Sequence, residues 1–573
     1  MVNIKIDGID VSVPEGTTIM QAASKIDKYI PKLCYLKDIN EIAACRVCLV
    51  ELEGMDKLIT SCNNTAKEGM VIYTNTPKVR MARKNNVQFI LSQHDFRCAT
   101  CVRSGSCMLQ KLSNDLNIVD MPFKQRYEEN RWDTSYPFIK EASKCIKCMR
   151  CIQICDKVQG LNIWDVTSTG SRTTVATKNN KDIKDLDCSQ CGQCVVNCPV
   201  GALRERDDTE LLWDSIADNN KVVVAQVAPA VRTAWGDWLG MPRQQATMGK
   251  ITDALKKLGV DYVFDTTFSA DLTIMEEANE FIQRFTSGEL KDRPMFTSCC
   301  PAWVRFLKSQ YPHMVKQLSS AKSPQQMFGA VMKTYFAQKI GVKPENIVTV
   351  SIMPCIAKKG EREMEFYYEE YAGHEVDIVL TTREFVRMIR EANIHPSTLK
   401  DVECDSLMKH ASGAGVIFGV TGGVMEAALR SAYYFITGEN PDANLFKMVR
   451  NTSKNLTEAK LKIGDVEVNI AVVSGLSNAR KLLESIQAGE SKYDFVEVMS
   501  CPNGCINGGG QTILDDKSYV DARSERLYFL DENSDIRFSH ENPDIKQLYS
   551  TFLEKPLSHT AHMLLHTEHS SFE

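Results

Sequence analysis

The stretch SCPNGCINGGGQ, residues 500–511, carries two cysteines four positions apart, followed by three consecutive glycines. Glycine loses more conformational freedom on folding than any other residue, so three in a row indicate a backbone that must approach something closely. Cys501 and Cys505 would face the same neighbour. The remaining cysteines indicate what that neighbour is.

The composition sets broad limits. The chain has 573 residues, enough for several domains, and a net charge of −5 from 68 basic and 73 acidic residues. This balance gives no reason to expect binding to nucleic acid or to an anionic membrane. The first residues, MVNIKIDGIDVSV, alternate like a strand and lack the apolar core of a signal peptide. With no apolar run of membrane-spanning length, the sequence predicts a soluble, cytoplasmic protein.

The unusual feature of the composition is the number of cysteines, which is 21. In a secreted protein these residues would predict disulfides, but no export signal precedes them and their spacings are typical of metal sites. We therefore expect reduced thiols that bind iron and sulfide.

Residues 1–78 read as a small β-rich domain, with short strands near 2–7, 10–13, 49–53 and 70–73. Within it the pattern C-x10-C-x2-C-x13-C suits a 2Fe–2S cluster on a β-grasp fold, although the first gap is longer than in plant-type ferredoxins. Zinc is the alternative. The expected ligands are Cys34, Cys45, Cys48 and Cys62.

Residues 79–125 look helical and contain the pattern H-x3-C-x2-C-x5-C. One imidazole and three thiolates can bind either zinc or a 4Fe–4S cluster. A histidine alone would be an ordinary surface or core residue, but four positions before a CxxC pair we expect a ligand. The set is His94, Cys98, Cys101 and Cys107.

Residues 126–208 carry the most specific pattern, C-x2-C-x2-C-x3-C, twice. In two-cluster ferredoxins the fourth cysteine of each run binds the other cluster. One 4Fe–4S cluster would therefore use Cys145, Cys148, Cys151 and Cys198, and the other Cys188, Cys191, Cys194 and Cys155. One 2Fe–2S and three 4Fe–4S clusters in series would conduct electrons to a site farther along the chain.

Beyond residue 209 apolar segments alternate with longer helical ones. The segments at 221–229, 346–354, 376–382 and 468–475 resemble buried strands. This alternation predicts α/β architecture with parallel sheets covered by helices over 209–514. Residues 515–573 read as a polar helical tail. The expected fold class is thus multidomain, α/β and α+β.

Three segments lie just beyond expected strands: FTSCCPAW (296–303), SIMPCIAKKGE (351–361) and EVMSCPNGCINGGGQ (497–511). They resemble the three signature motifs of the iron-only (FeFe) hydrogenases. The order of the N-terminal cluster motifs resembles the long form of that family, with accessory clusters, and the tail resembles its small-subunit segment. The resemblance extends over the whole chain.

The resemblance implies an H-cluster, in which a 4Fe–4S cubane is joined through a cysteine sulfur to a two-iron centre. That centre carries CO, cyanide and a bridging dithiolate amine. A fifth electron-transfer cubane is the alternative. The implied cubane ligands are Cys300, Cys355, Cys501 and Cys505, with Cys505 as the bridge.

The resemblance also implies contacts around the two-iron centre. Lys358 would donate hydrogen bonds to a cyanide, the alternative being a solvated surface lysine. Further cofactor contacts would come from Pro229, Ala230, Ser323, Gln325, Met353, Pro354 and Met499.

Cys299 is not assigned to iron. A thiol with an unperturbed pKa of about 8.5 can give and take a proton near neutrality. Glu277 and Glu280 are three apart on an expected helix and so share a face. With Ser319 and Arg284 they resemble the family's proton route, an ordinary acidic helix face being the alternative. The implied reaction is 2H⁺ + 2e⁻ ⇌ H₂.

The electron partner would be another protein. The sequence shows no nucleotide site, so ferredoxin, or companion subunits with flavin and NAD, would exchange electrons with the clusters. The segments 161–175, 201–208 and 562–567 look like catalytic subunits of multimeric, NAD-linked, electron-bifurcating hydrogenases. We favour that interpretation over a stand-alone ferredoxin-dependent enzyme. Separate maturation proteins would supply the two-iron centre.

Two other classes of protein share part of the pattern. A non-enzymatic electron-transfer subunit, like the large iron–sulfur subunit of respiratory complex I, would have the first three cluster motifs but would not need TSCCP or Lys358. Assembly factors and hydrogen sensors resemble the C-terminal part. Sensors often lose the proton-route residues, whereas Cys299, Glu277 and Glu280 are all present here.

Three weaker features carry no functional prediction. Gly413, Gly415 and Gly419 approach a dinucleotide motif, but the third glycine comes one residue late. Cys404 matches no motif and reads as a structural thiol. The C-terminal histidines would lie broadly along one helical face, for which we expect packing rather than a metal site; they are His559, His562, His566 and His569.

Overall fold

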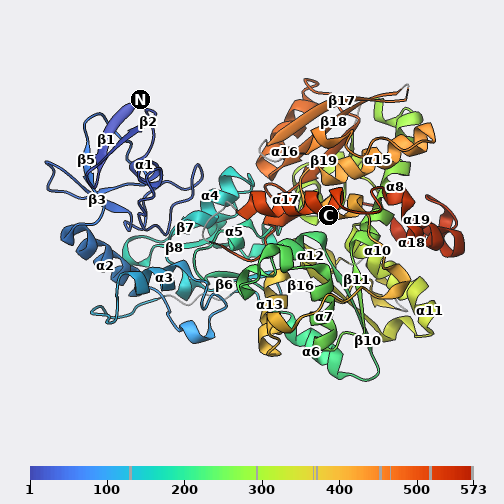
Figure 1. The fold of residues 1–573 in the computed structure, drawn as a ribbon, viewed down its shortest axis with the longest axis horizontal. Helices are drawn as coiled ribbons and strands as arrows, with labels where there is room; N and C mark the ends of the chain where they lie inside the picture. Colours follow the sequence, from blue (N-terminus) through green and yellow to red (C-terminus); the bar gives the residue numbers. More distant parts are fainter. Residues whose placement is uncertain are drawn as a thin grey trace. The chain divides into compact units, whose positions relative to one another are not determined.

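A computed structural model of the chain describes residues 1–127, 132–291, 294–364, 367–369, 372–450, 455–464, 466–514 and 519–569. The chain forms two compact units (Figure 1). The first comprises Met1–Lys157, Leu161–Leu186 and Asn197–Arg204, and the second Val158–Gly160, Asp187–Val196 and Glu205–Glu573. The start of the expected tail, 515–518, and residues 570–573 lie outside the described residues. None of the helices in the described ranges has both the length and the apolar character needed to cross a membrane.

The first unit begins with a mixed five-stranded sheet of order β2-β1-β5-β3-β4. The expected strands are all present, and β4 was not expected. Helix α1 (Ile19–Ser24) begins at Thr18 with a capping box, in which Gln21 and Thr18 exchange hydrogen bonds. The strands are β1 (Val2–Ile6), β2 (Ile9–Val13), β3 (Leu49–Leu52), β4 (Ile59–Thr60) and β5 (Val71–Tyr73).

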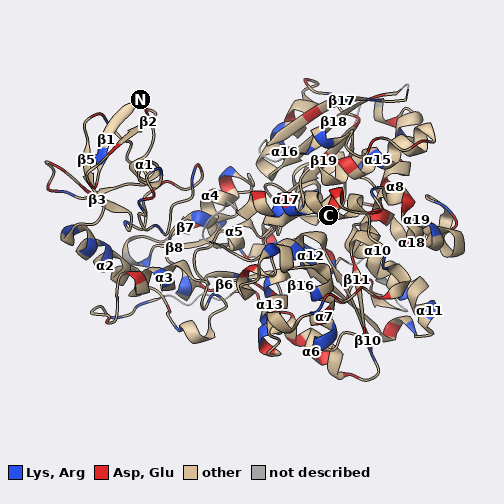
Figure 2. Cartoon of the chain, viewed as in Figure 1, with Lys and Arg blue, Asp and Glu red and all other residues tan. Residues whose placement is uncertain are grey.

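The segment expected to be helical over 79–125 is helical only in part. Helix α2 (Pro77–Leu91) starts with a proline after the capping Thr76, and α3 (Met108–Asp115) follows the last cysteine. Residues 92–107 between them form turns and a short 3₁₀ stretch. The cysteine-rich sequence there has Gly105 and no apolar period, so it lacks the amphipathic face that would favour a helix. The ribbon of α2 carries several basic positions, coloured blue in Figure 2, and the basic residues of this helix include the exposed Lys78 and Arg80.

The rest of the ferredoxin-like region consists of short elements. In the first unit these include an antiparallel β7–β8 hairpin, with Trp164 opposite Thr177. The elements are β6 (Phe138–Lys140), α4 (Arg150–Lys157), β7 (Trp164–Thr167), β8 (Thr174–Thr177), α5 (Gln193–Val196) and β9 (Leu203–Glu205).

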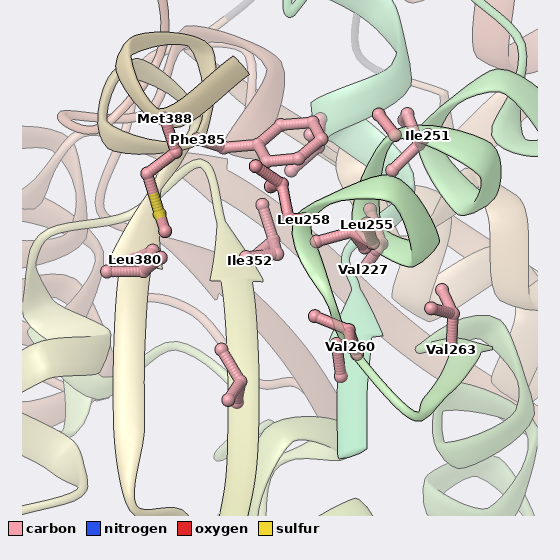
Figure 3. Packing of buried hydrophobic residues seen from close by; sticks show 14 of the residues in the cluster. Val227, Ile251, Leu255, Leu258, Val260, Val263, Ile352, Leu380, Phe385 and Met388 are labelled. Atoms are coloured by element: carbon pink, nitrogen blue, oxygen red, sulfur yellow. The ribbon is translucent and has the colours of Figure 1, made fainter. Parts of the chain in front are cut away.

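The second unit contains a parallel sheet of order β11-β10-β13-β16. Helices α7 (Met248–Leu258) and α13 (Thr382–Glu391) cover one face, where Leu255, Leu258 and Phe385 pack on Val227 and Ile352 (Figure 3). Both faces are buried, which explains why these strands read as continuous apolar runs. The strands are β10 (Val222–Val227), β11 (Tyr262–Asp265), β13 (Ile347–Met353) and β16 (Ile378–Thr381).

A second sheet has the order β12-β19-β18-β17. Its β12, β19 and β18 are parallel, and β17 forms an antiparallel edge hairpin with β18. Helices α15 (Gly423–Thr437) and α16 (Leu476–Gln487) contact this sheet. The strands are β12 (Met295–Phe296), β17 (Leu456–Ile463), β18 (Val466–Ser474) and β19 (Phe495–Met499).

Helix α8 (Thr267–Thr286) joins the cores of the two sheets. Its Phe268 and Leu272 belong to the core that contains Val224 of β10, whereas Ala270 and Ile274 pack in the core that contains Val472 of β18. A helix buried on several faces must hide any polar residue it carries, and α8 carries three buried glutamates.

The remaining described helices complete the second unit. The expected C-terminal helical tail is present and buries Ile545, Leu548 and Leu565 in the core that contains Phe268. These helices are α6 (Thr209–Ala217), α9 (Pro301–Gln310), α10 (Pro324–Val331), α11 (Ala337–Ile340), α12 (Ala357–Glu361), α14 (Gly413–Val416), α17 (Tyr519–Glu532), α18 (Pro543–Leu548) and α19 (His559–Leu565).

Candidate active site and cluster sites

A cavity lies where strands of both sheets end. Pro229 and Ala230 follow β10, and Cys355 follows β13 of the first sheet. Cys300 follows β12 and Cys501 follows β19 of the second. All five line the cavity, so two separate sheets supply its wall from their carboxyl ends.

The four cysteines implied as cubane ligands lie together. Cys300, Cys355, Cys501 and Cys505 all line the cavity. Burial, together with the neighbouring thiols, raises the pKa of Cys355 to about 12 and that of Cys501 well above its ordinary value. Four thiols facing one largely apolar cavity are costly as thiolates unless a cation compensates their charge. Four cysteine thiolates are the donor set of an iron–sulfur cluster.

The three glycines at 508–510 permit close approach between backbones. A Cβ at Gly508 would lie 2.2 Å from the Pro354 carbonyl oxygen, and one at Gly510 would lie 2.9 Å from the Cys355 amide nitrogen. At Gly509 the obstacle would be the Cys191 carbonyl oxygen, at 2.6 Å. The glycines therefore pack against the loops that carry other cysteines, and Gly508 also lines the cavity. Gly504 has a φ of +92°, which disfavours side chains.

Lys358 lies on the cavity wall and is buried, which excludes the surface-lysine alternative. Its Nζ donates to Glu361 Oε1 at 3.1 Å and Oε2 at 2.9 Å, and to the Cys299 carbonyl oxygen at 3.2 Å. Glu361 was not predicted. It lies three residues after Lys358 on α12. Side chains three apart on a helix are neighbours, so this spacing was the signal in the sequence that could have predicted the ion pair.

Glu361 also holds two predicted residues. Ser323 Oγ and Gln325 Nε2 donate to its Oε2 at 3.1 and 3.0 Å. Gln325 lines the cavity, whereas Ser323 does not, and its neighbour Pro324 does. The other predicted wall residues, Met353, Pro354 and Met499, all line the cavity; the additional lining residues that the sequence did not indicate include Thr266, Phe418 and Gly419.

Cys299 lines the same cavity beside Cys300. Burial, with a smaller effect from Glu277, raises the pKa of Cys299 well above its ordinary value. The sequence argument used the unperturbed thiol, whereas this environment favours the protonated form.

Glu277 is fully buried in α8, and in the described part of the chain neither carboxylate oxygen makes a hydrogen bond of good geometry, although Ser319 and the Ser298 backbone lie close enough to lower its pKa. Burial, and then the negative charge of Glu280, raise the pKa of Glu277 to about 8. A carboxyl group that exchanges a proton near neutral pH next to a buried thiol is suited to proton transfer.

The outer residues of the predicted route are connected. Ser319 Oγ donates to Glu280 Oε2 at 2.7 Å, and Arg284 Nη1 lies 3.4 Å from Glu280 Oε1. Arg284 also donates to the Leu318 carbonyl oxygen at 3.2 Å and pairs with Glu289 at 2.9 Å. The structure therefore brings all five predicted residues into one region, on α8 and on the loops after β12 and α9.

A further buried carboxylate, Glu497 of β19, was missed. It accepts hydrogen bonds at 2.7 Å from the Gly422 and Met425 amides at the start of α15. Burial raises its pKa to about 7 in spite of these bonds. An acidic residue in the apolar run FVEVM was the available signal.

The 2Fe–2S candidates come together in the first unit. The cysteines form two hydrogen-bonded pairs, Cys34 with Cys45 and Cys48 with Cys62. The hydrogen bond within each pair lowers the pKa of Cys45 and of Cys48. It raises the pKa of their partners, Cys34 and Cys62. The Arg150 guanidinium donates to the Cys34 carbonyl oxygen at 3.2 Å. Arg150 thereby ties this site to α4, which carries two of the predicted cubane ligands.

The His94 set also converges. His94, Cys98 and Cys107 line one pocket. His94 Nδ1 lies 2.9 Å from the Lys144 carbonyl oxygen, and burial lowers the His94 pKa. A neutral imidazole whose Nδ1 is bonded to a carbonyl has Nε2 free as a ligand. Cys101 interacts electrostatically with Cys98.

Of the two ferredoxin-like sets, one lies wholly in the first unit. Cys151 interacts electrostatically with Cys148, Cys145 and Cys198, as the predicted grouping requires. In the second set Cys155 belongs to the first unit and its three companions to the second. Cys191, one of these companions, lines the cavity with Cys355. Among the described residues, no three His, Cys, Asp or Glu side chains are close enough together to bind a single metal ion. The ligands of a cluster need not be that close, because each thiolate binds a different iron.

The C-terminal histidines do not share one helical face, so that prediction is wrong. Helix α19 ends at Leu565, and His566 continues in extended conformation. His566 is buried, whereas His559 and His562 are exposed.

The other two features without a functional prediction have structural roles. The three glycines of the discounted dinucleotide motif pack closely: a Cβ at Gly413 would lie 2.4 Å from Asp531 Oδ1. Cys404 hydrogen-bonds Thr252 at 3.6 Å, away from the cavity.

Family comparisons agree with this geometry. Residues 221–509 match the iron only hydrogenase large subunit, C-terminal domain, and residues 517–571 the iron hydrogenase small subunit. The N-terminal matches are a 2Fe–2S iron–sulfur cluster binding domain (1–77), the NADH-ubiquinone oxidoreductase-G iron–sulfur binding region (83–122) and a 4Fe–4S dicluster domain (144–202).

Several known proteins are similar over long stretches. The NADP-reducing hydrogenase subunit HndD of Solidesulfovibrio fructosivorans is 44% identical, and iron hydrogenase 1 of Clostridium pasteurianum is 38% identical, each over 99% of both chains. The cytosolic Fe–S cluster assembly factor narfl of Xenopus tropicalis is 34% identical over 62% of this chain and 75% of its own. The solved apo FeFe hydrogenase HydA1 from Chlamydomonas reinhardtii is 39% identical, with a TM-score of 0.58, over 64% of this chain and 99% of that one.

The alternative of a purely electron-transferring subunit does not account for the match over 221–509. With its cavity of cysteines at the ends of two sheets and its N-terminal 2Fe–2S and 4Fe–4S domains, the chain belongs to the iron-only (FeFe) hydrogenases.

Proposed function

We propose that this chain is the hydrogen-activating subunit of a cytoplasmic, multimeric hydrogenase, which couples 2H⁺ + 2e⁻ ⇌ H₂ to NAD(P) and ferredoxin in an electron-bifurcating complex. The observation that carries the proposal is the likeness to HndD, which is named as a subunit of an NADP-reducing hydrogenase and matches over 99% of both chains. Flavin and nucleotide would be bound by companion subunits, and maturation proteins would supply the two-iron centre.

The cavity residues fit an H-cluster. Cys300, Cys355, Cys501 and Cys505 would hold the cubane, with Cys505 as the bridge, and the bound cluster would supply the iron site at which protons and electrons combine to H₂. Lys358, held by Glu361, presents its ammonium group on the same wall and would donate to a cyanide. Met353 and Met499 would exclude water.

Protons would move along groups that the protein itself supplies. The Cys299 thiol, beside the cavity, would donate and be reprotonated from Glu277. Glu277 would in turn exchange protons with Ser319 and Glu280, whose side-chain oxygens are 2.7 Å apart. Arg284, which contacts Glu280, would lie at the solvent end of the route. Burial keeps Cys299 and Glu277 protonated at neutral pH, so the inner end of the route rests in the proton-loaded state.

Electrons would enter through the N-terminal clusters. The expected ligands are those of the four predicted sets, and the contacts of Arg150 and His94 link neighbouring sets within the first unit. Of the segments that favour a multimeric complex, 161–175 lies in the β7–β8 hairpin, whose connecting residues 168–170 are exposed while β8 is buried. His566 in 562–567 is buried by this chain's own residues. A stand-alone, ferredoxin-dependent hydrogenase is the second candidate, favoured by the likeness to iron hydrogenase 1.

Native isolation discriminates these candidates. The tagged chain, purified anaerobically from its host, should carry companion subunits, and that assembly should reduce NAD⁺ or NADP⁺ under H₂. The matured chain alone should reduce a viologen dye but not a nicotinamide. Isolation as a single chain that exchanges electrons with ferredoxin at full rate would support the second candidate instead.

The proton role of Cys299 is tested with a matched cysteine control. Cys299→Ala should lose at least about 10²-fold in H₂ turnover, the usual size of acid–base assistance. Cys404→Ala, which alters a thiol away from the cavity, should turn over at the parental rate. Infrared bands of CO and CN should be present in both variants. Near-parental turnover by Cys299→Ala with those bands intact would remove Cys299 from the route.

A further inference from the structure

The C-terminal segment reaches helix α8 next to the proposed proton route. Glu276, which precedes Glu277 in α8, is fully buried. Three groups of the C-terminal segment hydrogen-bond its carboxylate: the Tyr549 hydroxyl, the Leu557 amide at 2.9 Å and His566 Nε2 at 2.9 Å. A buried carboxylate needs such donors to be stable as an ion.

His566 connects this carboxylate to a turn. Its side chain is 1% exposed, and its Nδ1 lies 2.8 Å from Ser320 Oγ. Because a carboxylate only accepts hydrogen bonds, Nε2 carries a hydrogen and donates to Glu276. Both ring nitrogens are thus used. Two backbone hydrogen bonds flank His566 and join its segment to the 320–322 turn. The Lys322 amide donates to the Leu565 carbonyl and the Thr567 amide to the Ser320 carbonyl, each at 2.8 Å, so the turn is clamped on both sides of His566.

The clamped turn is the one that holds Glu280. The Ser320 amide lies 3.0 Å from each oxygen of Glu280, and Ser319 Oγ donates to the same carboxylate at 2.7 Å. His569 adds a contact from its Nε2 to the Ser319 carbonyl oxygen, at 3.1 Å. The chain of contacts therefore runs from Glu276 through His566 and Ser320 to Glu280.

We propose that His566 is a positioning residue for proton transfer: it locks the 319–320 turn onto α8, so that Ser319 and Glu280 stay within hydrogen-bond reach. The inference rests on the proposed proton route. Proton transfer requires heavy atoms about 2.6–3.2 Å apart, and a displacement of about 1 Å can cost about 10²-fold in rate. The sequence-distant tail would thereby be part of the enzyme's catalytic support.

Conservative variants separate the two contacts of His566. Asparagine places its amide near the position of Nδ1 and can keep the bond to Ser320, whereas glutamine reaches the position of Nε2 and can keep the bond to Glu276. His559→Ala, at an exposed histidine in the helix α19 that precedes His566, is the matched control. His566→Ala should lower H₂ turnover at least tenfold relative to that control, and His566→Asn should recover more of it than His566→Gln.

Two readouts distinguish positioning from general damage. The solvent deuterium isotope effect on turnover should rise in His566→Ala, because proton transfer becomes limiting. In protein without the two-iron centre, hydrogen–deuterium exchange of amides 319–322 should accelerate in His566→Ala and remain parental in His559→Ala. Should His566→Ala fail to fold, the ranking of the asparagine and glutamine variants still decides the question.

Turnover of His566→Ala within twofold of the control, an unchanged isotope effect, or glutamine outperforming asparagine would each overturn the inference. These failures differ from failure of the proposed route. If Cys299→Ala is inactive while His566→Ala is normal, only the role of His566 is lost. If Cys299→Ala is active, the route itself is wrong.

Discussion

At the scale of single residues, Glu277 is a carboxyl group whose environment differs strongly from water. It is fully buried, makes no hydrogen bond of good geometry among the described residues, and has a second carboxylate, Glu280, close by. Such an arrangement raises its pKa from 4.5 to about 8. Burying this carboxyl group lowers the free energy of unfolding, and a group that holds a proton near neutral pH fits the proposed proton route.

The raised pKa makes stability depend on pH. Between about pH 4.5 and 8 the unfolded carboxyl has lost its proton while the native one keeps it, so this group lowers the free energy of unfolding as pH rises through that window, by up to about 1.4 kcal/mol per pH unit. Glu277→Gln removes the effect. Thermal unfolding of protein without the two-iron centre should therefore show a smaller loss of Tm for the variant than for the parent between about pH 5 and 8. Parallel losses would contradict the buried, protonated state.

Glu361 gives a second prediction at this scale. It accepts hydrogen bonds from Lys358, Ser323 and Gln325. Glu361→Gln leaves a buried ammonium group without its counter-charge, a change that typically costs about 3–5 kcal/mol. We expect a lower Tm and, in matured protein, shifted CN bands in the infrared spectrum. Unshifted bands would show that Lys358 keeps its orientation without Glu361.

At the scale of elements, the glycine loop after β19 fits against two other cysteine-bearing loops. An alanine at Gly508 would place its Cβ 2.2 Å from the Pro354 carbonyl oxygen, a rigid backbone group. Gly508→Ala should thus displace the Cys355 loop and reduce cubane loading, measured as iron bound per chain after reconstitution. Gly438→Ala is the control, because its Cβ meets nothing within 4 Å and only its positive φ of 78° is unfavourable, at about 1 kcal/mol. Equal iron content in the two variants would contradict the packing argument.

Some elements of the fold and of the site could be predicted from the sequence, and others could not. The apolar strands and the cysteine spacings were predictable because both are local patterns, and the strand ends then placed Cys300, Cys355 and Cys501 at one site. The non-helical run 92–107 was not predicted, although Gly105 and the absence of an apolar period there were visible in the sequence. Contacts such as His566 with Glu276, 290 positions apart, leave no local pattern in either segment. Glu361 and Glu497 look like ordinary acidic residues until their partners are in place.

At the scale of the whole molecule, the proposed function assigns electron supply and hydrogen chemistry to different parts of the chain. Cys48→Ser should remove the 2Fe–2S signal in electron paramagnetic resonance, because Cys48 and Cys62 are paired in that site. Exchange of D₂ with solvent protons needs no external electrons and should be unaffected, while H₂-dependent reduction of the protein partner should fall at least tenfold. A parallel loss of both activities would indicate that the first domain supports the catalytic fold and not only electron transfer.

The division of the cavity wall between two sheets also constrains the order of events during synthesis. Cys300 and Cys355 leave the ribosome long before Cys501 and Cys505, which come within the last fifth of the chain. A nascent chain stalled ahead of those two can offer only half of the thiols, so iron should not be retained there until translation is almost finished. We expect arrested chains ending at 490 to release iron from this region, and chains extended through 573 to keep it.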